Sequence, residues 1–215
     1  MNRDIARILL DLKAVSLRID PPFTWTSGRL APIYCDNRLV ISDPARRKLV
    51  AFAFKALIEE KGFAPDVIAG TATAGIPHAA WLADLMDLPM VYVRGAAKGH
   101  GKQNRIEGRM ETGKRVVLIE DLISTGGSSV SAAEGLKEAG AEVLCVLAIF
   151  TYGLDAARKA FHDAGIPLYT LTSFDVLTKE AAESGLLGDS DLHTLSEWQK
   201  DPALWSEKRK QGTPE

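Results

Sequence analysis

Residues 116–128, VVLIEDLISTGGS, have the residue types and spacing needed to bind a phosphorylated sugar. The apolar run at 116–119 is typical of a strand covered on both faces of a parallel sheet. Glu120 and Asp121 follow it at the carboxyl end, the edge where open α/β sheets bind ligands. Residues 124–128 then offer backbone N–H groups, hydroxyls and glycines at the start of a predicted helix, where anions bind. We therefore expect carboxylates for sugar hydroxyls beside a phosphate cradle.

This stretch has two other possible interpretations. The plainer one is an ordinary strand–turn–helix with two solvated carboxylates. The other is a nucleoside-triphosphate loop, G-x-x-x-x-G-K-S/T, which requires a lysine after its second glycine. Gly127 is followed by Ser128, so that loop is excluded.

A second glycine turn, residues 70–77, follows a predicted strand at 67–69. Its small residues and hydroxyls, including Thr71, Ala72 and Thr73, suit a second anion nest at a helix start. A tight turn with no ligand is equally compatible with the residues, and the position at the same sheet edge favours the nest.

Residues 94–108 interrupt the regular pattern with glycines and with the cations Arg94, Lys98, His100, Lys102 and Arg105. Too few apolar side chains follow Val93 for this stretch to pack as core. A long loop inside an α/β domain is usually functional, so we expect a cationic lid that neutralises a departing anion. A solvated surface loop is the alternative.

The stretch 23–38 precedes the predicted sheet, and its residues from Phe23 to Cys35 indicate a β-hairpin turned at Ser27-Gly28. It would fold over the ligand edge as a hood, with Tyr34 placed to stack on a planar base. A plain hairpin with packing aromatics is the alternative.

The elements that position these residues alternate along the chain, which predicts a parallel sheet with helices on both faces. The apolar stripe of the helix from Pro44 to Gly62 is predicted at Leu49, Val50, Ala53, Phe54 and Leu57. The other predicted elements are strands at 67–69, 90–93, 115–120, 142–149 and 167–171, and helices up to Ala14 and at 76–86, 126–139 and 153–163.

We expect three parts in the chain of 215 residues. They are an N-terminal helix and hood hairpin (1–42), an α/β core (43–189) and a helical tail (190–215) anchored by Leu195, Trp198 and Trp205.

Composition excludes several classes of protein. The chain is 46% hydrophobic and 25% charged, as in globular proteins, and its net charge of -2 provides no basic field for nucleic acid. The charged N-terminus does not resemble a signal peptide, and the longest apolar run, 143–150, is too short for a membrane span. We expect a cytoplasmic protein with Cys35 and Cys145 as free thiols, and its four histidines lack metal-ligand spacing.

Taken together, these stretches resemble the bacterial orotate phosphoribosyltransferases. Residues 116–128 are similar to the signature with which type I phosphoribosyltransferases bind phosphoribosyl pyrophosphate (PRPP). The orotate branch is indicated by F-T-x-x-S-G, P-I-Y-C-D-N-R, R-x-x-x-K-x-H-G and I-E-G, and the resemblance runs from about Phe23 to Thr172.

The resemblance implies a type I phosphoribosyltransferase-like parallel sheet flanked by helices, with a small N-terminal hood. The implied reaction transfers ribose 5-phosphate from PRPP to orotate in de novo pyrimidine biosynthesis. It yields orotidine 5′-monophosphate (OMP) and pyrophosphate and uses Mg²⁺, which PRPP and water mainly hold without dedicated protein ligands. The resemblance also implies a homodimer in which residues 94–108 complete the neighbour's site.

The resemblance assigns catalytic roles to Lys98, His100 and Asp121. Orotate binding falls to Tyr34, Cys35, Arg38 and Ser124. PRPP binding falls to Thr71, Ala72, Thr73, Arg94, Lys98, His100, Glu120, Asp121, Leu122, Ile123, Ser124, Thr125, Gly126, Gly127 and Ser128.

The chain departs from better-studied members at three places. Ala74 replaces a lysine of the pyrophosphate turn, Gly95 replaces a second basic residue of the loop, and residues 150–153 lack an arginine for orotate. Arg38 or backbone amides are left to bind the orotate carboxylate.

Two rival functions remain open on the sequence. One is a phosphoribosyltransferase for another nucleobase, which the hood and loop disfavour. The other is a non-catalytic, PRPP-sensing regulator that binds nucleic acid, for which we expect a basic face that the composition does not indicate.

Overall fold

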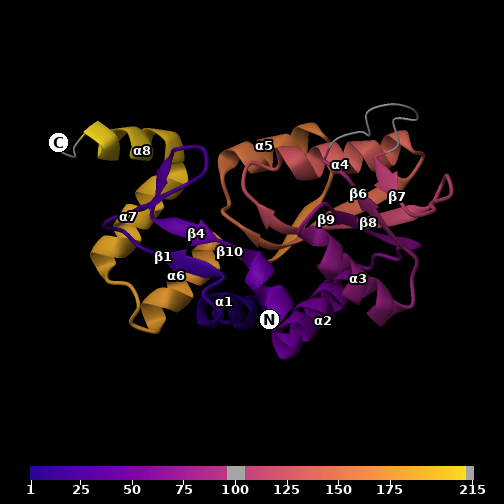
Figure 1. Ribbon diagram of the computed structural model, residues 1–215, viewed down its shortest axis with the longest axis horizontal. Coiled ribbons are helices and arrows are strands. Elements are labelled where there is room, and N and C mark those ends of the chain that lie inside the picture. The colour runs from indigo at the N-terminus through magenta and orange to yellow at the C-terminus, as the bar shows by residue number, and fades with distance from the viewer. Residues whose placement is uncertain (96–104, 212–215) are drawn as a thin grey trace.

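The computed structural model describes residues 1–95 and 105–211. Figure 1 shows a sheet between two helical layers, with the N-terminal strands and C-terminal helices grouped beside it. The six-stranded sheet has the order β10-β9-β8-β5-β6-β7, and neighbouring strands are parallel except for the antiparallel pair β6–β7. Its strands are β5 (Val67–Thr71), β6 (Met90–Val93), β7 (Ile106–Glu107), β8 (Arg115–Ile123), β9 (Glu142–Thr151) and β10 (Leu168–Ser173). The predicted parallel sheet is confirmed.

Helices cover both faces of the sheet because its central strands are apolar on both sides. Helices α2 (Pro44–Glu60) and α3 (Gly75–Met86) lie on one face, and α4 (Gly127–Glu138) and α5 (Asp155–Asp163) lie on the other (Figure 1). Ile119 packs in the core with Phe54 of α2, whereas its neighbour Leu118 packs with Leu136 of α4. This alternation along β8 fixes which side chains face each helical layer.

The hood consists of two short antiparallel ribbons. Strand β2 (Phe23–Thr24) pairs with β3 (Leu30–Ala31), which confirms the predicted hairpin over residues 23–31. Its predicted end is wrong, because β4 (Ile33–Cys35) pairs with β1 (Val15–Leu17) instead. The 3₁₀ helix η1 (Asn37–Ser42) then leads to α2, whose first turn is capped by the Asp43 carboxylate.

The C-terminal helices support the hood. They are α6 (Phe174–Glu183), α7 (Asp189–Lys200) and α8 (Pro202–Gln211). Trp198 of α7 is fully buried and packs edge-to-face on Trp25 and Tyr152, with ring centroids 5.9 and 5.5 Å apart. The Leu30 N–H donates a hydrogen bond to the Ser206 hydroxyl of α8 at 2.9 Å. The predicted anchors of the tail, Leu195, Trp198 and Trp205, are buried, which confirms the prediction. The tail therefore packs against the hairpin and supports it.

Two packing predictions were wrong. Leu49 was placed in the buried stripe of α2, but it is 53% exposed, because Ala51 and Ile58 complete that stripe. Residues 94–108 were expected to add nothing to the core, yet Ile106 is buried there and β7 extends the sheet by pairing with β6.

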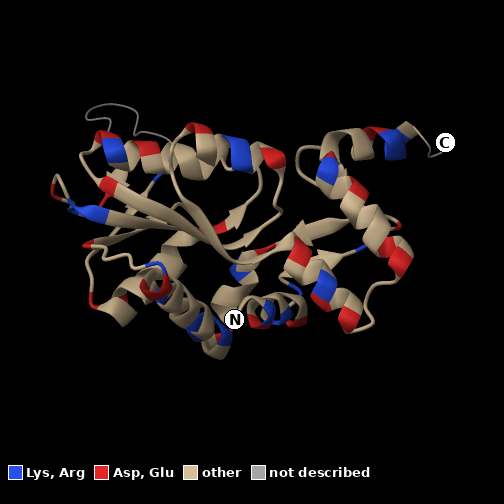
Figure 2. Ribbon diagram, turned by 180° about the vertical axis from the view of Figure 1, so that it is seen from behind, with Lys and Arg blue, Asp and Glu red and all other residues tan. Residues whose placement is uncertain are grey.

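Strand β8 continues to Ile123 and β9 to Thr151, past their predicted ends, because the two strands pair along this whole length. No helix in the described part of the chain has the length and apolar character needed to cross a membrane. Acidic and basic residues are interspersed along the ribbon of the helices in Figure 2.

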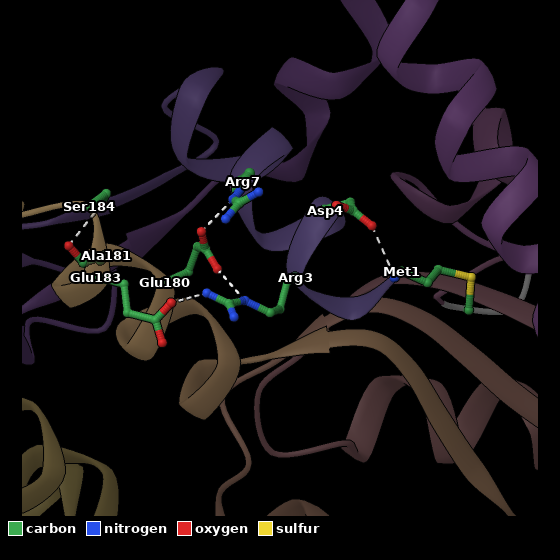
Figure 3. A network of polar contacts seen from close by, with 8 residues as sticks. All are labelled: Met1, Arg3, Asp4, Arg7, Glu180, Ala181, Glu183 and Ser184. Carbon is green, nitrogen blue, oxygen red and sulfur yellow. Dashed lines mark hydrogen bonds and ion pairs between the residues drawn. The ribbon is translucent and has the colours of Figure 1, made fainter.

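A polar network joins α1 (Asn2–Asp11) to α6, two segments far apart in the sequence (Figure 3). The buried carboxylate of Glu180 accepts hydrogen bonds from Arg3 Nε, at 2.7 Å, and from Arg7. Arg3 also pairs with Glu183. These arginines hold the pKa of Glu180 below its ordinary value.

We predict that this network makes stability depend on pH. Because the pKa of Glu180 is lowered in the folded state, its contribution is present above the unfolded pKa, about 4.3, and is lost as the pH falls through the folded value. Thermal unfolding of wild type and Glu180→Gln, from pH 7 to pH 3, should show wild type more stable at neutral pH and the difference shrinking below about pH 4. The half-exposed Glu183→Gln serves as control with a smaller effect, and parallel pH curves for wild type and Glu180→Gln would contradict the prediction.

Candidate active site

The sheet brings together three stretches that are separate in the sequence. Strands β5, β6 and β8 are parallel neighbours, so their carboxyl ends meet at one edge. A small cavity of about 80 Å³ there is lined by Thr71 at the end of β5, by Ala72 after it, by Arg94 after β6 and by Ser128 of α4. The predicted anion nest, phosphate cradle and first cation of the polar segment thus border one space.

Glu120 fastens helix α4 to strand β8. The residue is 6% exposed; its Oε1 accepts a hydrogen bond from the Asp121 N–H at 3.0 Å, and its Oε2 accepts one from the Ser129 hydroxyl at 2.9 Å. Burial, followed by the neighbouring Asp121, raises the pKa of Glu120. Both acids lie within β8 instead of beyond its end, and the carboxylate of Glu120 is occupied by partners of its own chain.

Asp121 borders a second cavity, about 490 Å³ in volume, together with Thr73, Ala74 and Arg38. Its backbone oxygen accepts a hydrogen bond from Asn37 Nδ2 at 2.6 Å, and Asn37 Oδ1 accepts one from Cys35 Sγ at 3.3 Å. Burial raises the pKa of Asp121. Since Asn37 is almost fully buried, this pair fixes the hood on the strand that carries the carboxylates.

The start of α4 is open to an anion. Gly126 precedes the helix with φ +82° and no side chain caps the first turn, so its leading N–H groups have no partner within the helix. Glycine is required at 126 twice over, because of its positive φ and because a Cβ there would lie 2.9 Å from Phe161 Cε2.

The turn after β5 packs directly on β8. A Cβ at Gly75, the first residue of α3, would lie well inside contact distance of the Ile119 carbonyl oxygen. The missing side chain therefore sets the distance between the second turn and the strand bearing Glu120 and Asp121. The Ala72–Thr73 peptide in this turn is cis.

A third cavity, about 410 Å³, lies between the hood and the end of β8. The aromatic side chains of Trp25, Tyr34 and Tyr152 line it, and Ser124 borders it from the phosphate side. Trp25 is held by a hydrogen bond from its Nε1–H to the Ile33 oxygen at 3.0 Å. The cavity suits a planar, partly polar ring.

The structure unites most of the predicted site residues. Tyr34, Cys35 and Ser124 line the hood cavity, while Arg38 borders the Asp121 cavity and donates from Nη2 to Asp36 Oδ2 at 2.8 Å. Lys98 and His100 lie outside the described residues.

The described ends of the polar segment are tied down. Arg94 pairs with Glu107 at 3.4 Å. Arg105, expected as a lid cation, donates to the Arg94 oxygen and to Ser131 of α4, each at 3.1 Å. Ile123 was expected to bind PRPP, and its side chain is fully buried, which leaves only its backbone for a ligand.

Sequence reasoning missed several contributors. Asn37 and Ser129 hold the strand and helix that carry the site, and Arg29 and Trp25 line the hood cavity. Trp25, Arg29 and Asn37 lie within the stretch 23–38, but only their tertiary contacts show that their roles differ from those of neighbouring residues. No local pattern marks Ser129 as the partner of Glu120.

Known proteins resemble this chain in sequence and in fold. Residues 40–167 match the family model described as Phosphoribosyl transferase domain. An orotate phosphoribosyltransferase of Fusobacterium nucleatum is 57% identical over 203 residues, covering 94% of this chain and 96% of the relative. A crystal structure of orotate phosphoribosyltransferase from Aeropyrum pernix has a TM-score of 0.73 at 28% identity, covering 86% of this chain and 99% of that one. The structure of Leishmania donovani UMP synthase has a TM-score of 0.77 at 28% identity, covering 92% of this chain and 42% of that one.

We predict that Gly75→Ala destabilises the protein by about 1–3 kcal/mol, the usual effect of inserting atoms into a packed interior. The new Cβ must displace the backbone of β8 at Ile119. Denaturant unfolding measures the change, with Gly95→Ala as control, since a Cβ at 95 meets no atom of the described residues within 4 Å. Equal midpoints for the two variants would refute the close approach.

Proposed function

The chain belongs to the orotate phosphoribosyltransferase family, and we propose that the site described above carries out its reaction with the residues assigned below. The reaction transfers ribose 5-phosphate from PRPP to orotate and yields OMP and pyrophosphate in pyrimidine biosynthesis. One observation carries the assignment of residues: an aromatic cavity and a phosphate cradle adjoin at the end of β8, where Ser124 borders the first and Ser128 the second.

PRPP is held by its phosphates and its ribose. The N–H groups at 124–128 bind the 5-phosphate. Those at the start of α4 are available because they have no partner within the helix. Thr71 and Ala72 hold the pyrophosphate across the small cavity. Asp121 accepts hydrogen bonds from the ribose hydroxyls, and Glu120 supports it from within the strand through the Asp121 N–H.

Orotate lies in the hood cavity against Tyr34 and Tyr152, with Ser124 between the base and the sugar phosphate. This placement orients the ring nitrogen toward the anomeric carbon of PRPP. Holding both reactants in line removes much of the entropic cost of a bimolecular step.

The chemistry breaks the bond between the anomeric carbon and the pyrophosphate oxygen, whose electron pair leaves with pyrophosphate. The orotate nitrogen forms the new bond to that carbon and loses its proton. No covalent nucleophile is needed, because the reaction is accelerated by stabilising the charge that develops in the transition state. Arg94, Lys98 and His100 neutralise the leaving group, and Lys98 or His100 donates a proton to it.

Mg²⁺ fits the donor chemistry of this site. Within the described residues no cluster of three or more His, Cys, Asp or Glu side chains is placed to hold a metal ion. Magnesium commonly uses one or two carboxylates together with substrate phosphates and water, and Asp121 borders the cavity where such a carboxylate is needed. Bound there, the ion would neutralise charge on the PRPP oxygens.

The second copy of the chain packs on the exposed apolar face of α2 and α3. Leu49 and Phe52 are about half exposed, and a groove of about 390 Å³ beside Phe52 is lined by Trp81, Lys48 and Asp84. Lys48 and Asp84 border the same groove, so this face offers both signs of charge to a second copy, as a self-complementary contact requires. Residues 94–108 then complete the neighbour's site.

The assignment is tested by following orotate consumption with PRPP and Mg²⁺, alongside adenine, guanine, hypoxanthine and uracil as competing bases. We expect orotate to be consumed far faster than any purine. Turnover of a purine instead of orotate would assign the chain to base salvage. Binding of nucleic acid without transfer would assign it to regulation.

We predict that Asp121→Asn keeps the fold but weakens PRPP binding and slows turnover. The substitution is nearly isosteric, and it removes the charged acceptor for the ribose hydroxyls. Calorimetric titration with PRPP and Mg²⁺, together with kcat, measures both effects. Unchanged values of Kd and kcat would remove Asp121 from the site.

We predict that Lys98→Ala lowers kcat by about 10²-fold or more, the usual effect of losing a donor to the transition state. If the site is shared between chains, mixing this variant with Asp121→Asn restores activity, because a heterodimer unites one intact loop with one intact carboxylate site. Subunit exchange is verified with a tag on one variant. Verified exchange without recovered activity would show that each site is built from one chain.

A further inference from the structure

The carboxylate of orotate needs a cationic partner in the hood cavity. Orotate is a planar pyrimidine whose carboxylate is ionised at neutral pH, and an ionised group enters a largely apolar cavity only when it is paired. Three aromatic side chains line this cavity. Of the described residues that line it, Arg29 is the only one with a charged side chain.

Arg29 has a guanidinium that is free to bind a ligand. Across the described residues, its side chain has no ion pair and no hydrogen-bond partner. Arg38, the other arginine considered for orotate, donates to the Asp36 carboxylate from Nε and Nη2. Arg38 also borders the Asp121 cavity and not the aromatic one.

The backbone of Arg29 is held in a closed turn. The Trp25 N–H donates to the Arg29 oxygen, and the Gly28 N–H donates to the Trp25 oxygen, both at 2.8 Å. On the other side, the Leu30 N–H is bonded to Ser206 of α8. The anchored Trp25 indole and the C-terminal helix thus fix the backbone from which the Arg29 side chain extends. Less conformational freedom is therefore lost when this side chain binds a ligand.

We propose that Arg29 binds the carboxylate of orotate and of OMP, and that it makes the enzyme select pyrimidines that carry this group. The guanidinium presents paired N–H donors that match a carboxylate in a bidentate manner. Backbone amides, the alternative donors, carry no net charge and discriminate less. The inference rests on the proposed function, because it assumes that the hood cavity holds the base.

Calorimetric titration with OMP and with UMP, which lacks the carboxylate, tests the inference. Arg29→Gln should weaken OMP binding about 10- to 100-fold, as expected for the loss of hydrogen bonds to a charged group, while UMP binding changes less than about 2-fold. Arg29→Lys should recover part of the loss, because it restores the charge without the paired geometry. PRPP binding, measured in parallel, should stay at the wild-type value.

Arg18→Gln is the matched control. Arg18 is also a hood arginine, but it lies over the Phe23 ring at 4.3 Å and does not line the cavity. Its variant should keep the wild-type ratio of OMP to UMP affinity.

Three outcomes of the titrations with the variants would overturn the inference. They are equal losses for OMP and UMP in Arg29→Gln, no loss for either ligand, or a loss specific to OMP in Arg38→Gln instead. Equal affinity of the wild type for OMP and UMP would also overturn it. None of these results touches the proposed function, which fails separately if the wild type does not consume orotate with PRPP.

Discussion

The requirement that a buried carboxylate be hydrogen-bonded organises this site. Glu120 lies under helix α4, away from water. Its two carboxyl oxygens accept hydrogen bonds from the Asp121 N–H and from the Ser129 hydroxyl. Because one partner is on the strand and the other on the helix, the geometry of the turn between them is fixed. Asp121 and the open N–H groups of α4 are consequently presented to the same side.

The close packing around this strand extends the constraint to the rest of the site. Gly75 lets the second turn rest on the Ile119 carbonyl, and Asn37 binds the backbone of Asp121 from the hood. The hood in turn lies on Trp198 and Ser206 of the C-terminal helices. Residues from both ends of the chain therefore decide the shape of a cavity at the middle of the sheet.

Charge is distributed unevenly over the described part of the site. Arg38, Arg94 and Arg105 are engaged with Asp36, Glu107 and Ser131. Neutral N–H groups of the turns and the carboxylate of Asp121 border the phosphate side. Arg29 borders the base side. This separation suits a substrate pair in which the phosphates and the base carboxylate must be recognised by different groups.

The sequence by itself determined the fold class, the alternation of strands and helices from β5 to β10 apart from β7, and the positions of the two glycine turns. These features are encoded locally, by apolar runs, helix starts and glycines within a few residues of one another. The same local signals placed Ser124 and Asp121 at the cavities, because parallel strands end at a common edge. Tyr34 was placed there by the predicted hood. They failed at Leu49 and Ile106, where burial depends on which surface a neighbour covers.

Only the tertiary structure decided which polar groups pair between different elements. No periodic pattern in the sequence predicts these hydrogen bonds, because packing decides which polar groups meet. They join Ser129 with Glu120, Asn37 with Asp121 and Ser206 with Leu30. Arginines of the hood are alike in the sequence, and the structure distinguishes them. Arg38 lies beside a carboxylate that occupies it, whereas Arg29 stands at an aromatic cavity with its charge available to a ligand.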